Sequence, residues 1–247
     1  MSQTSSDLVE FMDGVKHGAI NMISFKGRHF KNPIILMSVR WYVAYSLSYR
    51  DIEELMAERG VKVDHSTINR WVIKYSPLLE KELSNKQKHL VGRGWRMDET
   101  YIKVKGKWCY LYRANDKKGA TINFMLSKKR DQKAAKKFFR KAIGTAGTPE
   151  KVTIDESGSN NAALQSINIM LGETRQMLIR QIKYLNNIVE QDHRFIKKIS
   201  GPMFGFKSYT SAYSTQMGIE LHYILHKGQH TNSSNTAFFE KFYALAA

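Results

Sequence analysis

Three acidic residues in this chain are best placed to do chemistry: Asp98, Asp155 and Glu190. Aspartate is a poor strand former, so Asp98 in the middle of a predicted strand indicates a functional role. Asp155 ends the next apolar strand, and ligands of open α/β sheets bind outside the strand ends. Glu190 lies one turn into a helix that can reach the same edge. We therefore expect the three carboxylates to meet, although each taken singly could be an ordinary surface charge.

Three carboxylates held together repel one another unless cations neutralise them. Mg²⁺ suits this role because it binds carboxylate oxygens, retains several waters and supports phosphate chemistry. Two ions about 3.5–4 Å apart can activate an attacking oxygen and stabilise the leaving oxygen of an in-line displacement. We expect two Mg²⁺ ions, for which Mn²⁺ can substitute, bound by Asp98, Asp155 and Glu190, with Asp98 bridging both.

The predicted helix that carries Glu190 places two bases on the same face. Glu190, Arg194 and Lys197 are spaced at i, i+4 and i+7, so they share one side of the helix. We expect Arg194 and Lys197 to bind DNA phosphates beside the metal ions. Another face is expected to pack on the sheet through Ile188, Phe195 and Ile199. Asp192 points elsewhere, and His193 is either a DNA contact or a surface histidine.

The residues around the acids predict an α/β sheet. From about Trp95 the period changes, and three strands joined by short turns precede helix, strand, helix, strand and helix. This is the element order of a ribonuclease H-like fold, a mixed sheet flanked by helices. The predicted strands are 95–104, 107–114, 120–127, 151–155 and about 177–182, and the predicted helices are 131–143, about 160–172, 187–200 and 208–227.

The segment before the sheet has the pattern of a helix-turn-helix. Ser48 and Asp51 predict a capping box at the start of one helix, and Gly60 predicts its end. Asp64 or Ser66 then caps a second helix, whose inward face carries Ile68, Trp71, Val72 and Tyr75. Outward positions early in that helix suit base edges in a major groove, namely His65, Thr67, Asn69 and Arg70. A plain helical hairpin with a solvated face is the alternative.

The charge balance indicates a polyanionic partner. Lys and Arg total 39 against 22 Asp and Glu, which gives a net charge of +17 and a pI of about 9.8. Nucleic acid is the first candidate, and a membrane is disfavoured because the bases are spread along the chain. The single cysteine, Cys109, excludes an internal disulfide and a zinc ribbon. With neither a signal peptide nor a membrane span legible, we expect a cytoplasmic, nucleoid-associated protein.

Longer stretches resemble bacterial insertion-sequence transposases of the insertion-sequence-six family. The resemblance is carried by RWYVAYSLSYRDIEELMAERGV, VDHSTINRWV, RMDETYIKVKGKWCYLYRA and QIKYLNNIVEQDHRFIKK. That family has an Asp-Asp-Glu triad with 34 residues between the second and third acids, and here 190 − 155 − 1 gives 34. By resemblance, Asp98, Asp155 and Glu190 are the metal ligands, and Lys197 matches the basic residue seven positions after the glutamate.

This resemblance implies a metal-dependent transesterification at short terminal inverted repeats, in which a freed 3′-hydroxyl attacks target DNA. The implied partners are double-stranded transposon ends and target DNA, held by a homodimer or a larger assembly. Glu156 stands where many members have a lysine and adds negative charge beside the site. Two alternatives stay open: a ribonuclease H-like nuclease without strand transfer, and an inactive relic that acts only as a DNA-binding protein.

These predictions divide the chain into four parts. We expect a variable leader at 1–24 and a helix-turn-helix DNA-binding domain at 25–90. A ribonuclease H-like catalytic domain is expected at 91–228, followed by a C-terminal tail at 229–247. An all-α DNA-binding module would therefore precede an α/β domain that carries the chemistry.

Overall fold

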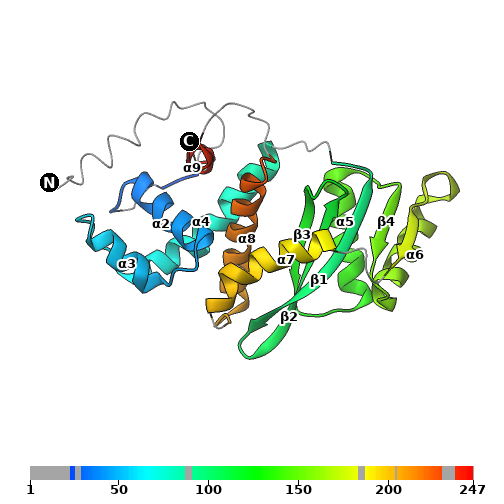
Figure 1. Cartoon of the computed structure of the whole chain (residues 1–247), viewed down its shortest axis with the longest axis horizontal. Helices are drawn as coiled ribbons and strands as arrows, with labels where there is room; N and C mark the ends of the chain where they lie inside the picture. The colour runs from blue at the N-terminus through cyan, green and yellow to red at the C-terminus, as the bar shows by residue number, and fades with distance from the viewer. Residues whose placement is uncertain are drawn as a thin grey trace. The chain divides into compact units, whose positions relative to one another are not determined.

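The computed structural model describes residues 23–25, 29–86, 91–182, 187–203, 205–229 and 237–246. Almost all of the predicted leader at 1–24 lies outside the described residues. The chain divides into a helical unit and a unit built on a sheet (Figure 1). The helical unit takes residues 1–87, 199–203 and 208–247, and the sheet unit takes 88–198 and 204–207.

Across the described residues, the sheet unit contains a five-stranded sheet in the order β3-β2-β1-β4-β5. The strands are β1 (Gly94–Val104), β2 (Lys107–Asp116), β3 (Thr121–Ser127), β4 (Lys151–Ile154) and β5 (Leu178–Gln181). The first three strands pair antiparallel, whereas β4 runs parallel to β1 and to β5. This mixed sheet confirms the predicted ribonuclease H-like fold, and every predicted strand is present within a few residues of its expected bounds.

Helices cover both faces of this sheet. On one face, α5 (Gln132–Ala146) and α6 (Gly158–Leu171) enclose an apolar core that includes Trp95 and Met97. On the other face lies α7 (Asn187–Ser200), as Figure 1 shows. Successive side chains of a strand point to opposite faces. Because Met97 enters the core, its neighbour Asp98 points toward α7.

The helical unit contains α2 (Asn32–Ala44), α3 (Tyr49–Ala57), α4 (His65–Lys86), α8 (Tyr209–His226) and α9 (Phe238–Tyr243). The predicted capping box is confirmed, since Ser48 Oγ accepts from the Asp51 N–H at 3.1 Å and Asp51 accepts from the Ser48 N–H at 2.7 Å. Gly60 follows α3 with a φ of 73°. Asp64, one of the two predicted caps, accepts from the Thr67 N–H at the start of α4. Among the residues that the structure describes, we find no helix that could span a bilayer.

By its contacts α8 groups with the helical unit, whereas the sequence prediction includes this helix in a catalytic domain that ends at 228. This helix packs against α4 and α2 instead of extending the sheet unit. A glycine makes the close approach possible: a Cβ added to Gly218 would lie 2.5 Å from Val43 Cγ1 and 2.8 Å from Ser76 Oγ. Because Val43 and Ser76 lie far from Gly218 in the sequence, this packing cannot be predicted from the sequence around α8.

Candidate active site

Asp98 and Asp155 lie side by side where β1 meets β4. The two strands run parallel with Arg96 beside Thr153, and this register continued by two residues puts Asp98 beside Asp155. Carboxylate oxygens of Asp98, Asp155 and Glu99 all lie within 4.8 Å of one another. Oxygen donors at this spacing form a ligand set for a hard divalent cation. Two of the three predicted acids are therefore brought together.

Glu99 belongs to this cluster, and the sequence reasoning missed it. Its side chain is only 2% exposed, and Oε1 accepts from Arg130 Nε at 3.3 Å and from Asn160 Nδ2 at 3.1 Å. Its Oε2 is buried without a hydrogen-bond partner in the described part of the chain. Burial, the largest cause, raises the pKa of Glu99. The available signal was strand alternation, which assigns this acid to the core side of β1.

Burial, together with neighbouring acids, raises the pKa of Asp98 to about 7. Burial is the largest cause, and the charges of Glu99, Asp155 and Glu190 add to it. The Glu99 N–H opposes the shift by donating to Asp98 Oδ1 at 2.8 Å. Desolvation and neighbouring like charges both disfavour an ionised carboxyl. The surrounding residues thus do not fully stabilise the ionised form of Asp98, and a bound divalent cation would do so.

Glu190 lies near the acidic cluster and not inside it. It occupies the first turn of α7 and is exposed. Its charge reaches Asp98, because it contributes to the raised pKa of that carboxyl. It is not among the three residues whose oxygens lie within 4.8 Å of one another. Further along the same helix, Arg194 and Lys197 are exposed, as the i, i+4, i+7 spacing requires.

A buried ion pair fastens α7 to the sheet. Asp192 Oδ2 accepts from Arg113 Nη1 at 2.8 Å and from Asn115 Nδ2 at 2.7 Å, both on β2. The buried side of α7 therefore differs from the apolar face predicted from the sequence. It consists of Val189, Asp192, His193, Ile196 and Ile199, while Phe195 is only partly buried. The Ile188 side chain lies outside the described residues.

His193 is a buried neighbour of Asp98 and not a surface residue. Its Nδ1 lies 3.7 Å from Asp98 Oδ2, and its side chain is 8% exposed. Burial, with the charges of Arg113 and Lys197, lowers the pKa of His193 to about 3. The imidazole is therefore neutral at neutral pH and adds no positive charge to the cluster.

Arg130 is the basic residue of the cluster. Its guanidinium donates to Glu99 Oε1 at 3.3 Å, to Asp155 Oδ2 at 3.2 Å and to the Tyr101 hydroxyl at 3.4 Å. Arg130 comes from the loop between β3 and α5, so no pattern local to the acids points to it. It partly neutralises two carboxylates while Asp98 keeps a raised pKa.

Comparison with known proteins decides the family. The family model described as a DDE domain matches residues 92–229. The transposase for insertion sequence-like element IS431mec of Staphylococcus aureus is 42% identical over 203 residues, which are 82% of this chain and 88% of that protein. The chain belongs to the DDE transposases of insertion sequences. The resemblance stated from the sequence is thereby confirmed, as is the class of enzyme, one that transfers polynucleotide strands.

Other similarities of this transposase are narrower or weaker. The transposase IS66 family matches residues 35–148. The transposase for insertion sequence element IS257 in transposon Tn4003 of Staphylococcus aureus is 41% identical over 82% of this chain and 88% of that protein. The HTLV-2 integrase catalytic core domain in complex with magnesium (trimeric form) is similar with a TM-score of 0.44 and 16% identity, covering 61% of this chain and 97% of that chain.

The transposase exposes two of the four residues predicted to contact bases. His65 and Arg70 are exposed on α4, whereas Thr67 and Asn69 are half-buried. His65 Nδ1 lies 3.0 Å from Glu53 Oε2, and Thr67 Oγ1 accepts from Arg70 Nη2 at 2.6 Å. The start of α4 is therefore a preorganised polar surface whose side chains already contact one another.

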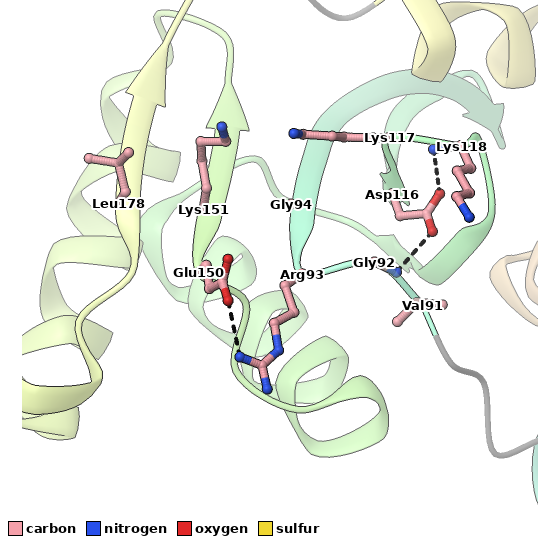
Figure 2. Close-up of a pocket in the computed structure, with 10 residues that line it drawn as sticks. All are labelled: Val91, Gly92, Arg93, Gly94, Asp116, Lys117, Lys118, Glu150, Lys151 and Leu178. Carbon is pink, nitrogen blue, oxygen red and sulfur yellow. Dashed lines mark hydrogen bonds and ion pairs between the residues drawn. The ribbon is translucent and has the colours of Figure 1, made fainter.

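A hollow of the transposase, about 570 Å³ in volume, lies where β1 and β4 begin, whereas Asp155 follows the end of β4 (Figure 2). Lys117 extends toward Lys151 there, and repulsion by Arg180 and Lys117 lowers the pKa of Lys151. Both acids of the hollow are engaged: Asp116 accepts from a backbone N–H at 2.9 Å, and Glu150 pairs with an arginine at 3.0 Å. The hollow is basic, so the acidic cluster is the candidate active site.

Proposed function

We propose that this transposase cleaves DNA strands at the terminal inverted repeats of an insertion sequence and transfers them to target DNA, using divalent metal ions. The observation that carries the proposal is the pair of neighbouring strand positions that brings Asp98 beside Asp155. DNA phosphates are negative and would be repelled by this cluster unless cations bind there. Membership of the DDE transposases supports the same reaction.

We propose Asp98, Asp155 and Glu190 as the catalytic residues, holding two Mg²⁺ ions or Mn²⁺ in their place. When bound, these ions supply Lewis-acid and nucleophile-activating chemistry at a phosphodiester. Glu190 suits this role because it is exposed at the start of α7 and because its charge contributes to the raised pKa of Asp98. Glu99 is less suited because its side chain is only 2% exposed, whereas that of Asp155 is 29% exposed. We propose that Glu99 positions Arg130.

The residues of α7 position both acid and substrate in this proposal. The ion pair between Asp192 and Arg113 fixes the helix on the sheet, two residues after Glu190. Arg194 and Lys197 then lie on the exposed face that continues from Glu190. Basic side chains in a row bind successive phosphates and set the register of a DNA strand.

We propose that α3 and α4 recognise double-stranded transposon ends. The candidate contacts are His65, Thr67, Asn69 and Arg70. The net charge of +17 supports binding to the DNA backbone. Transposition requires two ends to be held together, so a homodimer or larger assembly on DNA is expected, working in the cytoplasm at the nucleoid.

The test is a strand-transfer reaction. Protein, Mg²⁺, labelled end-containing DNA and a target plasmid should give joined products. Asp98→Asn, Asp155→Asn and Glu190→Gln should each abolish joining while DNA binding is retained, because the amide keeps the shape and removes the charge. Glu156→Gln, an exposed acid beside Asp155, is the matched control and should still join DNA.

Two outcomes would contradict the proposal. Cleavage that never leads to joined products would favour a ribonuclease H-like nuclease that only hydrolyses DNA. Joining by any of the three triad variants at the rate of the parent would remove that residue from the catalytic set. Loss of joining in Glu156→Gln alone would place the essential acid one residue further along.

A further inference from the structure

An aromatic patch, formed by Tyr101, Trp108 and Tyr110, is open to solvent on the hairpin of β1 and β2. Trp108 is 57% exposed and Tyr101 is 48% exposed. The Tyr101 ring centroid lies 5.9 Å from that of Trp108 and 5.4 Å from that of Tyr110. The strand register sets Tyr101 opposite Tyr110 and Lys103 opposite Trp108, so these four side chains share one face of the hairpin.

Of the three rings, only Tyr110 is partly buried and packs against the core, so the core does not account for Tyr101 and Trp108. The other face of the hairpin already supplies the buried side chains, namely Ile102, Val104 and Cys109. Cross-strand aromatic pairs stabilise a sheet by about 0.2–1 kcal/mol each. This is less than the free energy that would be gained if the exposed tryptophan ring were buried. The pairing of β2 with β3 begins at Tyr110, so Trp108 lies beyond the end of β3. Covering the aromatic patch with a flat apolar partner would therefore be favourable in free energy.

Positive charge surrounds the aromatic patch. Between residues 100 and 110 the chain carries Lys103, Lys105 and Lys107 and no acid. All three lysines are exposed, and Lys103 Nζ lies 5.9 Å from the centroid of the Trp108 ring. Rings interleaved with lysines are typical of surfaces that bind single-stranded nucleic acid, where bases stack on the rings and cations follow the phosphates. This charge favours a nucleic acid over an apolar protein surface as the occupant.

Arg130 connects the aromatic patch to the acidic cluster. Its guanidinium donates both to the Tyr101 hydroxyl, at 3.4 Å, and to Asp155 Oδ2, at 3.2 Å. Tyr101 also follows Glu99 by two residues on the same face of β1. A nucleotide whose base lies on Tyr101 therefore has its phosphate within reach of Arg130 and of Asp155.

We infer that the aromatic patch stacks an unpaired DNA base adjacent to the phosphodiester on which the acids act. This inference rests on the proposed function insofar as DNA is the substrate. Bases inside a duplex already stack on one another, so only a nucleotide that has left the stack offers a free face to these rings. Stacking would hold an opened strand in register with Asp98 and Asp155.

The test measures binding by the full chain in EDTA, where no metal-dependent chemistry occurs. The probe is a single-stranded oligodeoxynucleotide of about 12 residues containing 2-aminopurine, compared with its duplex. Parent protein should quench the 2-aminopurine. Trp108→Val, which keeps a strand-forming side chain, should weaken single-strand binding about tenfold and duplex binding less than about twofold. Its salt dependence should match that of the parent because no charge is removed.

Two further variants complete the design. Trp108→Phe keeps a ring and should retain most of the single-strand affinity. Ile169→Ala removes a side chain that is 81% exposed on α6, and it should bind both DNAs as the parent does. Together, the two variants show whether weaker binding results from the loss of an aromatic ring or from the loss of any exposed apolar side chain.

The inference is overturned if the parent does not quench the probe, or if Trp108→Val binds single strands as tightly as the parent. Equal weakening of single-strand and duplex binding would also overturn it. A changed oligomeric state with unchanged DNA affinity would make the aromatic patch a protein interface instead. The binding assay in EDTA is independent of the metal-dependent reaction. If the protein binds single strands as expected but does not join strands in Mg²⁺, the proposed function is contradicted and this inference is not.

Discussion

Replacing Asp192 by alanine should destabilise the sheet unit strongly. The Asp192 and Arg113 side chains are 4% and 0% exposed and pair at 2.8 Å. Removing one partner of a buried ion pair costs about 3–5 kcal/mol, because the other charge stays buried without its counter-charge. Asn115 loses the same acceptor, so the upper half of that range is expected.

Urea unfolding of the full chain is the assay. With a slope of about 2 kcal/mol per molar, the midpoint for the sheet unit should fall by roughly 2 M. Hydrogen exchange should localise the loss to amides of β2 and α7. The matched control is Glu150→Ala, which breaks the ion pair with Arg93, whose partners are 69% and 76% exposed. An exposed pair of this kind contributes less than about 1 kcal/mol.

The reasoning is refuted if Asp192→Ala shifts the midpoint no more than Glu150→Ala does. A second variant checks the cause of the loss. Asp192→Leu combined with Arg113→Met should recover much of the stability, because apolar side chains of similar volume often replace a buried ion pair without cost. If the double variant were as unstable as Asp192→Ala, packing of α7 rather than the unpaired charge would be responsible.

Further expectations concern the acids, the packing and the DNA contacts. The raised pKa of Asp98, about 7, means that its contribution to stability is present below its ordinary pKa and is lost as pH rises toward 7. In EDTA, the melting temperature of Asp98→Asn should therefore be higher than that of the parent near pH 8 and equal to it near pH 3. Equal melting temperatures of variant and parent at both pH values would contradict the buried cluster. Gly218→Ala should cost about 1–3 kcal/mol in urea titrations, since its Cβ would lie 2.5 Å from a neighbouring side chain. Gly144→Ala in α5, where nothing lies within 4 Å, should instead stabilise by up to about 1 kcal/mol. Arg194→Ala and Lys197→Ala should each reduce the slope of log DNA affinity against log salt by about 1, and an unchanged slope would remove that residue from the phosphate contacts.

The sequence by itself determined the elements of both units, because their signals are local. The capping box of Ser48, the glycine at position 60 and the Asp64 cap each depend on residues within a single turn. The change from helical to strand periodicity near Trp95 likewise needs no distant partner. The meeting of Asp98 with Asp155 was expected from the strands that carry them, but the register of β1 with β4 decides it, because Asp98 lies in the middle of β1 and Asp155 directly after β4.

Only the tertiary structure decided what surrounds Asp98 and which faces are covered. Glu99 and Arg130 join the cluster through contacts that span 31 residues of sequence, and His193 approaches from α7. Periodicity distinguishes the faces of a helix and does not say which one a neighbour will cover. A polar face of α7 is buried because Arg113 on β2 supplies a counter-charge to Asp192, which no pattern within α7 contains. The same holds for α8, whose packing in the helical unit depends on the space that Gly218 leaves for Val43 and Ser76.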